Sequence, residues 1–148
     1  MQALYFAYGS NLLSQRMRER VPSARPRGPA RLEGWRLAID KPGRDGTAKA
    51  NLRRAVGDAV WGVVYALDPA DWPALDACER GYDRIEVTVL LADTATRAAT
   101  YVSSLCSPDR VPSRSYKRCL VQGAREHGLP AHWVALLEAL PECDDPAA

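Results

Sequence analysis

The spacing of apolar and polar residues predicts six β-strands in the 148-residue chain. Residues 60–67 are rich in the β-branched and aromatic side chains that strands favour. In residues 82–91 every second side chain from Ile85 to Leu91 is apolar, so one face of that strand is expected to be buried. The predicted strands are residues 4–8, 31–39, 48–53, 60–67, 82–91 and 98–105, the last two joined as a hairpin across residues 93–97.

Four segments carry the apolar spacing and end signals of helices. Asp68 and Pro69 suit the N-cap and first position of one helix, and Gly81 ends it. Prolines 22, 26 and 29 indicate a loop, and Gly57-Asp58 indicates a turn. The predicted helices are residues 12–20, 68–80, 113–127 and 131–140. Mixed strands and helices predict an α+β fold with a curved sheet.

The stretch LYFAYGSNLL, residues 4–13, predicts a strand, a tight turn and a helix. Gly9 can take a positive φ, and Ser10 or Asn11 can cap the following helix. Such a turn directs free backbone amides and the positive end of the helix dipole at one point. We expect it to bind a small anion or an oxyanion, although a turn with only a capping role would have the same sequence.

Length and composition favour one domain over residues 1–148, with a flexible tail over residues 142–148. No apolar run approaches the roughly 20 residues that cross a bilayer, and the N-terminus lacks a signal-peptide pattern. The four cysteines have no CxxC spacing. We therefore expect free thiols, a buried Cys78 and a cytoplasmic location without membrane binding.

Charge is unevenly distributed along the chain. Residues 1–54 hold twelve Lys/Arg and four Asp/Glu, a net charge of +8, whereas residues 55–148 have a net charge of −6. The basic residues are dispersed and carry no aromatic RNA-binding motif, so a small anionic molecule is a better partner than nucleic acid. His127 and His132 do not have metal-ligand spacing, and no phosphate-binding glycine motif occurs, so we expect neither metal nor cofactor.

Glu79 is the strongest candidate for chemistry. It falls at the predicted C-terminus of a helix, where the dipole opposes a negative charge and partial burial would raise the pKa of the carboxyl. A raised pKa suits a general base that later acts as an acid. The alternative is an exposed glutamate paired with Arg80 or Arg84. Glu86, in mid-strand, is the rival carboxylate, and its simplest interpretation is a solvent-facing or arginine-paired side chain.

Five motifs occur in a recognisable order. They are FAYGSNL, VWGVVYAL (residues 60–67), LDACERGYDRIEVTV (residues 75–89), TYVSS (residues 100–104) and SYKRCLVQGAREHGLP (residues 115–130). Together they resemble the gamma-glutamylcyclotransferase family over nearly the whole chain. The resemblance implies a small mixed β-barrel surrounded by helices, with the YGSN turn at the mouth of a cavity.

The resemblance also assigns expected roles. Glu79 matches the catalytic glutamate of the family. Whether Tyr101 and Glu86 line the site stays open. The expected substrate-binding residues are Tyr8, Gly9, Ser10, Asn11, Leu12, Tyr82 and Tyr116.

The implied activity is cyclisation of a γ-glutamyl amide to 5-oxoproline with release of an amino acid, without a cofactor. Three alternatives stay open: cyclisation of γ-glutamyl amines such as γ-glutamyl-ε-lysine, removal of γ-glutamyl groups from an acylated carrier, and binding of a small anion without catalysis. A homodimer is compatible with the sequence, which does not decide the oligomeric state.

Overall fold

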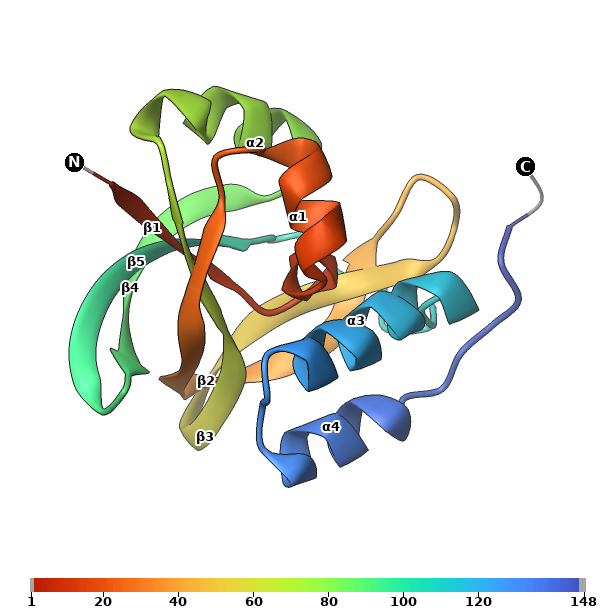
Figure 1. Cartoon of the computed structure of the whole chain (residues 1–148). Helices are drawn as coiled ribbons and strands as arrows, with labels where there is room; N and C mark the ends of the chain where they lie inside the picture. Colours follow the sequence, from red (N-terminus) through yellow and green to blue (C-terminus); the bar gives the residue numbers. More distant parts are fainter. Residues whose placement is uncertain (1, 147–148) are drawn as a thin grey trace.

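In residues 2–146, which the computed structural model describes, five strands close into a barrel in the order β1-β3-β2-β4-β5. Helices α1 and α2 cover one end of the barrel, and α3 and α4 lie along its side (Figure 1). The elements are β1 (Ala3–Ala7), the 3-10 helix η1 (Ser10–Leu12), α1 (Ser14–Arg20), β2 (Arg25–Pro42), β3 (Ala48–Leu67), the 3-10 helix η2 (Pro69–Asp71), α2 (Trp72–Cys78), β4 (Asp83–Leu91), β5 (Thr94–Val102), α3 (Arg114–Glu126) and α4 (Ala131–Glu138).

The barrel is mixed, as expected from the resemblance. Its neighbouring strands run antiparallel, except that β1 and β5 pair in parallel where Tyr5 faces Ala99. That parallel pair closes the sheet, so it leaves no open edge there. The predicted α+β class and barrel are confirmed.

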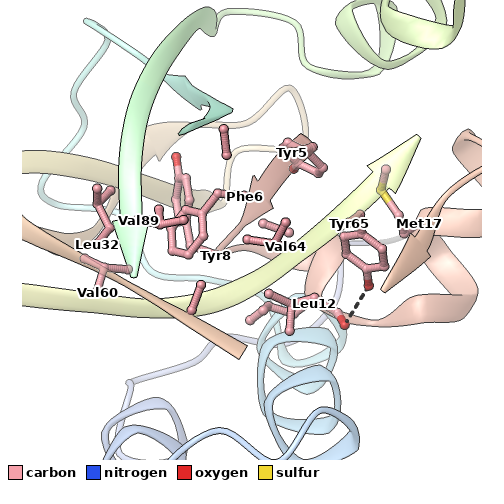
Figure 2. Packing of buried hydrophobic residues seen from close by; sticks show 14 of the residues in the cluster. Tyr5, Phe6, Tyr8, Leu12, Met17, Leu32, Val60, Val64, Tyr65 and Val89 are labelled. Atoms are coloured by element: carbon pink, nitrogen blue, oxygen red, sulfur yellow. Dashed lines mark hydrogen bonds between the residues drawn. The ribbon is translucent and has the colours of Figure 1, made fainter. Parts of the chain in front are cut away.

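The barrel interior is filled by large apolar side chains (Figure 2). Phe6, Val60 and Val64 are fully buried, and Leu32 and Val89 pack in the same cluster. Burying a side chain of this size contributes about 1.5–3 kcal/mol to stability. Because β1 leads directly from this core into η1, the core sets where the turn begins.

A buried tyrosine fixes the η1 turn to the barrel. The Tyr65 hydroxyl lies 2.8 Å from the carbonyl oxygen of Asn11. It lies 3.2 Å from the carbonyl oxygen of Leu12 (Figure 2). On the other side α3 packs against the turn at Gly123, where a Cβ atom would stand 2.5 Å from the Leu12 carbonyl carbon. Only glycine permits that approach, which brings Tyr116 at the start of α3 close to the turn.

Two predicted loops are parts of longer strands. Pro26 and Pro29 lie inside β2, where they pair with β3 beside a register shift, so the loop predicted from prolines 22, 26 and 29 is wrong in its later part. The strands predicted at residues 48–53 and 60–67 are one strand, β3. The turn predicted at Gly57-Asp58 is a bulge in it, opposite a register shift in β2. Gly57 has a φ of 88° there, so its turn-forming residues produce a bulge and not a strand end.

The hairpin after β4 is tighter than predicted. Ala92 and Asp93 both have positive φ values, 49° and 62°, and β5 begins at Thr94. Two such residues make the two-residue turn that matches strand twist. The loop predicted over residues 93–97 is therefore wrong, because threonine and arginine there belong to a strand with an exposed face.

The segment after α4 contacts the start of α3. The Ser115 amide donates to Asp145 at 2.8 Å, and Arg114 lies 2.9 Å from Asp144. The flexible tail over residues 142–148 stays a prediction, and residues 147–148 lie outside the described residues. The four cysteines are free thiols, as predicted. Cys78 is exposed, so its predicted burial is wrong, because the last turn of α2 faces a cleft.

None of the helices in residues 2–146 combines the length and apolarity that crossing a membrane requires.

Candidate active site

A cleft of about 570 Å³ opens where the end of the barrel meets its helices. A smaller recess of about 30 Å³ lies deeper and shares part of its lining. The cleft is lined by segments from four parts of the chain: Ser10, Arg16 and Arg20 in η1 and α1, residues 41–45 and 49 of the β2–β3 hairpin, residues 77–82 at and just after the end of α2, and Leu105 and Tyr116. Tyrosines 5, 8, 82, 101 and 116 line the recess. Segments far apart in the sequence therefore build one site.

Glu79 lies at the junction of cleft and recess. It is the C-cap of α2, as the sequence predicted, and its amide donates to the Leu75 and Asp76 carbonyls. The Oε1 atom accepts from Asn11 Nδ2 at 2.9 Å and from Arg20 Nη1 at 3.4 Å. The side chain is only 13% exposed. Its partner is Arg20, and not Arg80 or Arg84.

Burial dominates the electrostatics of Glu79. Desolvation raises the pKa of the carboxyl above its usual value, and the nearby Arg20 and the Asn11 hydrogen bond lower it less than burial raises it. The predicted direction of the pKa shift is confirmed. A carboxylate that binds a proton more readily than usual, and opens onto a cleft, is suited to take a proton from a ligand and return it.

Asn11 connects three polar groups of the site. Its Nδ2 atom donates both to Glu79 and, at 3.0 Å, to the Tyr5 hydroxyl. Its Oδ1 atom accepts from Arg20 at 3.3 Å. The predicted capping role is wrong, because Gly9 and Leu13 occupy the N-cap positions of η1 and α1. The side chain is instead free to hold Glu79 in place.

Ser10 does not cap a helix either. Its hydroxyl accepts from Arg16 Nε at 2.9 Å, on the wall of the cleft. The extended residue Leu13 separates η1 from α1, so the turn lies one step before the helix that it was predicted to cap.

Gly9 serves a different purpose from the one predicted. Its φ is −109°, so no positive φ is required. A Cβ atom at this position would lie 3.3 Å from both Ala50 Cβ and the Tyr116 hydroxyl, so glycine preserves room in the recess.

Some backbone amides of the turn already donate hydrogen bonds within the protein, and others do not. Leu12 and Leu13 donate to the carbonyls of Gly9 and Ser10, and the Leu12 side chain is buried in the core. Leu12 therefore lies apart from the cleft lining. Within residues 2–146 the Ser10 and Asn11 amides have no hydrogen-bond acceptor. These two amides can receive an anion.

Tyr82 and Tyr116 bind the two backbone polar groups of the same residue, Ala50. The Tyr82 hydroxyl donates to the Ala50 carbonyl at 2.6 Å, whereas the Tyr116 hydroxyl accepts from the Ala50 amide at 2.8 Å. Burial raises the pKa of both phenols, so both keep their protons. Tyr116 can still donate its proton to a ligand, whereas the Tyr82 proton is already used.

Two other tyrosines lie in the recess, whereas the rival carboxylate, Glu86, lies outside the cleft. Tyr8 donates to the carbonyl of Tyr101, and the Tyr101 hydroxyl donates to Asp76 at 2.6 Å. Both line the recess. Glu86 is 69% exposed and pairs with Arg97, outside the cleft. Its simplest interpretation is therefore confirmed.

Sequence reasoning missed Arg16, Arg20 and Tyr5. Both arginines line the cleft. Their i, i+4 spacing, which places them on one helix face just after the turn, was the available signal. Tyr5 sits in an apolar strand and gave no signal that separates it from a core residue. Across residues 2–146 no three His, Cys, Asp or Glu side chains are grouped to hold a metal ion.

Comparisons with known proteins identify relatives of the chain in sequence and in fold. The model of the AIG2-like family matches residues 59–137. Gamma-glutamylcyclotransferase of Bos taurus is 33% identical over 151 residues, which span 95% of this chain and 80% of that protein. The Homo sapiens protein of the same name is 33% identical over 150 residues with the same coverage. A solved structure named gamma-glutamyl cyclotransferase matches with a TM-score of 0.90 and 30% identity, covering 100% of this chain and 93% of that one.

Proposed function

The chain belongs to the gamma-glutamylcyclotransferase family, and we propose that it cyclises γ-glutamyl amides of amino acids to 5-oxoproline. The proposal rests mainly on Glu79, a buried carboxylate of raised pKa that lies in the lining of an open cleft. A site that only bound anions would not need a desolvated carboxylate. The relatives bear the name of this enzyme, and the cleft supplies the proton acceptor that the reaction requires.

The reaction needs one proton acceptor that also returns its proton. Glu79 takes a proton from the α-ammonium group of the substrate, and the freed nitrogen lone pair attacks the γ-carbonyl carbon. The new carbon–nitrogen bond closes a five-membered ring. The protonated Glu79 gives its proton to the former amide nitrogen, whose bond to the γ-carbon then breaks. The carboxylate takes the second proton of the ring nitrogen and passes it to the released amine, so Glu79 ends in the carboxylate form. The products are 5-oxoproline and an amino acid.

Ring closure also requires the flexible glutamyl chain to be held in one conformation. The Ser10 and Asn11 amides and the Tyr116 hydroxyl offer hydrogen-bond donors within the same cleft and recess. We propose that they bind the α-carboxylate or the oxygen that becomes negative during attack. Gly9 and Tyr8 shape the recess around that point, and Tyr82 holds the Ala50 peptide.

The test is mass-spectrometric detection of 5-oxoproline with a panel of γ-glutamyl amino acids, γ-glutamyl-ε-lysine and glutathione. Glu79→Gln keeps the shape of the side chain and removes the base, so we expect at least about a hundredfold loss of turnover. Glu86→Gln is the matched control, because that carboxylate lies outside the cleft. Equal turnover in native protein and Glu79→Gln would remove Glu79 as the base. A folded protein that forms no 5-oxoproline from any substrate would refute the proposed function.

Three further expectations accompany this proposal: one domain, a cytoplasmic location and a small-molecule partner in place of nucleic acid. A homodimer is checked by sedimentation of the purified chain.

A further inference from the structure

The outer cleft carries a marked excess of positive charge. Two acidic side chains, Asp45 and Glu79, face six basic ones in its lining. The basic residues are Arg16, Arg20, Lys41, Arg44, Lys49 and Arg80. Five of these six come from the basic half of the sequence, so the uneven charge distribution of the chain is concentrated at this opening.

Internal pairs account for only part of this charge. Arg20 pairs with Glu79 at 3.4 Å, and Lys49 pairs with Asp45 at 3.3 Å. For Arg16, Lys41, Arg44 and Arg80 no carboxylate lies within ion-pair distance in the part of the chain that the structure describes, and Arg16 donates to the Ser10 hydroxyl at 2.9 Å. The cleft therefore offers four cations to a ligand, and three of them, Lys41, Arg44 and Arg80, are not held by a polar partner of their own.

Lys41 is the most confined of the three. Its ammonium group lies 5.0 Å from the centre of the Tyr82 ring, and its Cε atom would be 2.9 Å from a Cβ atom on Gly81. The lysine thus reaches from the β2–β3 hairpin across to the segment that follows Glu79. Arg44 is exposed at the tip of the same hairpin, on the outer side of the cleft.

The sizes of the recess and of the cleft determine which way a bound substrate extends. The recess of about 30 Å³ corresponds to little more than the volume of one water molecule. A γ-glutamyl group held at Glu79 must therefore extend its leaving amino acid into the wide cleft, toward Lys41 and Arg44. The α-carboxylate of the leaving amino acid can pair with one of these cations, and the others remain free to pair with a second acidic group.

We propose that this cleft selects γ-glutamyl substrates whose leaving amino acid bears a second acidic group, and that Lys41 and Arg44 recognise that group. The inference rests on the proposed function and specifies its substrate class. Attraction of an extra carboxylate by partly exposed cations lowers KM more than it raises kcat. A leaving group that carries an additional amine is disfavoured for the same reason.

The test compares kcat/KM for γ-glutamyl-glutamate and γ-glutamyl-glutamine, which match in size and differ by one charge, with γ-glutamyl-lysine as the cationic substrate. We expect the native protein to prefer the glutamate substrate over the glutamine substrate by about tenfold. Lys41→Gln and Arg44→Gln should each reduce this ratio by about threefold, mainly through KM. The control Arg118→Gln removes an equal charge from a separate groove on α3 and should leave the ratio unchanged.

Each outcome decides the matter. A ratio at or below one in the native protein overturns this inference while the cyclisation itself stands. Equal losses on both substrates in Lys41→Gln and Arg44→Gln also overturn it, because they indicate a merely structural role. A preference that weakens as ionic strength rises supports it. Absence of 5-oxoproline from every substrate refutes the proposed function, and this inference with it.

Discussion

Two glutamates seven residues apart, Glu79 and Glu86, occupy opposite kinds of surroundings. Each accepts from an arginine, Arg20 in the first case and Arg97 in the second. The Glu79 side chain is 13% exposed and also accepts from Asn11, whereas Glu86 is 69% exposed. An arginine neighbour therefore does not distinguish a reactive carboxylate from a surface one. Burial and a second, neutral donor do.

The difference originates in local structure. Glu79 is the C-cap of α2, and two residues later Gly81, with a φ of 83°, reverses the chain. This places the carboxylate over the cleft, where α1 and η1 supply its partners. Glu86 lies in the middle of β4 and alternates with the apolar residues, so its side chain points away from the barrel interior.

Of the two side chains that hold Glu79, the neutral donor Asn11 is expected to cause the larger loss when it is removed. Asn11→Leu keeps the approximate volume but leaves the Tyr5 hydroxyl and Glu79 without their shared partner. We expect about a hundredfold fall in kcat and about 1–3 kcal/mol lower free energy of unfolding. Steady-state kinetics and urea unfolding measure the two effects. Gln15→Leu, on the exposed face of α1, should change neither, and normal kcat in Asn11→Leu would show that Glu79 needs no positioning.

A smaller loss is expected from removing the charged partner. Arg20 is the largest influence that lowers the pKa of Glu79, so Arg20→Met should raise that pKa further. Because the base must be deprotonated, the ascending limb of the kcat/KM profile should move to higher pH, with about tenfold lower activity at neutral pH.

The matched variant for Arg20→Met is Arg97→Met, which removes the partner of Glu86. It should leave the pH profile in place, because that pair is exposed and outside the cleft. Identical profiles for the two variants would mean that the Arg20–Glu79 contact does not influence the base.

The same contrast explains what the sequence could and could not predict. The α+β class, the helix that ends near Glu79 and the solvent-facing Glu86 follow from local patterns: alternation, capping residues and a terminating glycine. The closed barrel was expected only from the family resemblance. The long β2 and β3 strands do not, because prolines and Gly57 interrupt the pattern while pairing continues through bulges. Local signals of chain reversal cannot tell a turn from a bulge.

Only the site residues that lie in recognisable sequence motifs could be predicted. Asn11 could be recognised as a polar residue of the turn, but its contacts with Tyr5 and Arg20 arise from packing of separate segments. The role that we propose for Lys41 and Arg44 depends on the β2–β3 hairpin lying across the cleft from the end of α2. No short-range sequence pattern encodes that arrangement.

A finer contrast separates two tyrosines within the site. Tyr116→Phe removes a hydroxyl whose proton is free for a ligand, whereas Tyr82→Phe removes one already donated to Ala50. We expect about a fivefold loss of kcat/KM for Tyr116→Phe and a smaller loss for Tyr82→Phe. Both should cost about 1 kcal/mol of stability, because each leaves one Ala50 backbone group unpaired. Equal kinetic effects would indicate that Tyr116 only supports the peptide.

The smallest expected effect concerns the pH dependence of stability and is expected at only one of the two glutamate sites. Burial raises the folded-state pKa of Glu79, so the native protein holds this proton more tightly than the unfolded chain does. Stability is therefore lost as pH rises from the usual glutamate pKa, about 4.3, through the raised folded-state value. Above that pH range the buried, charged carboxylate of Glu79 continues to destabilise the native protein.

Glu79→Gln removes this burden, so it should raise the free energy of unfolding at pH 7, and the gain should vanish near pH 4 where the native carboxyl is protonated. Glu86→Gln should stay within about 0.5 kcal/mol of native protein at both pH values, because it breaks only an exposed ion pair. Urea unfolding at the two pH values measures both. A destabilised Glu79→Gln at pH 7 would mean that Arg20 and Asn11 stabilise the carboxylate by more than burial disfavours it. The carboxylate would then be held as a fixed anion, and a different group would have to carry the proton.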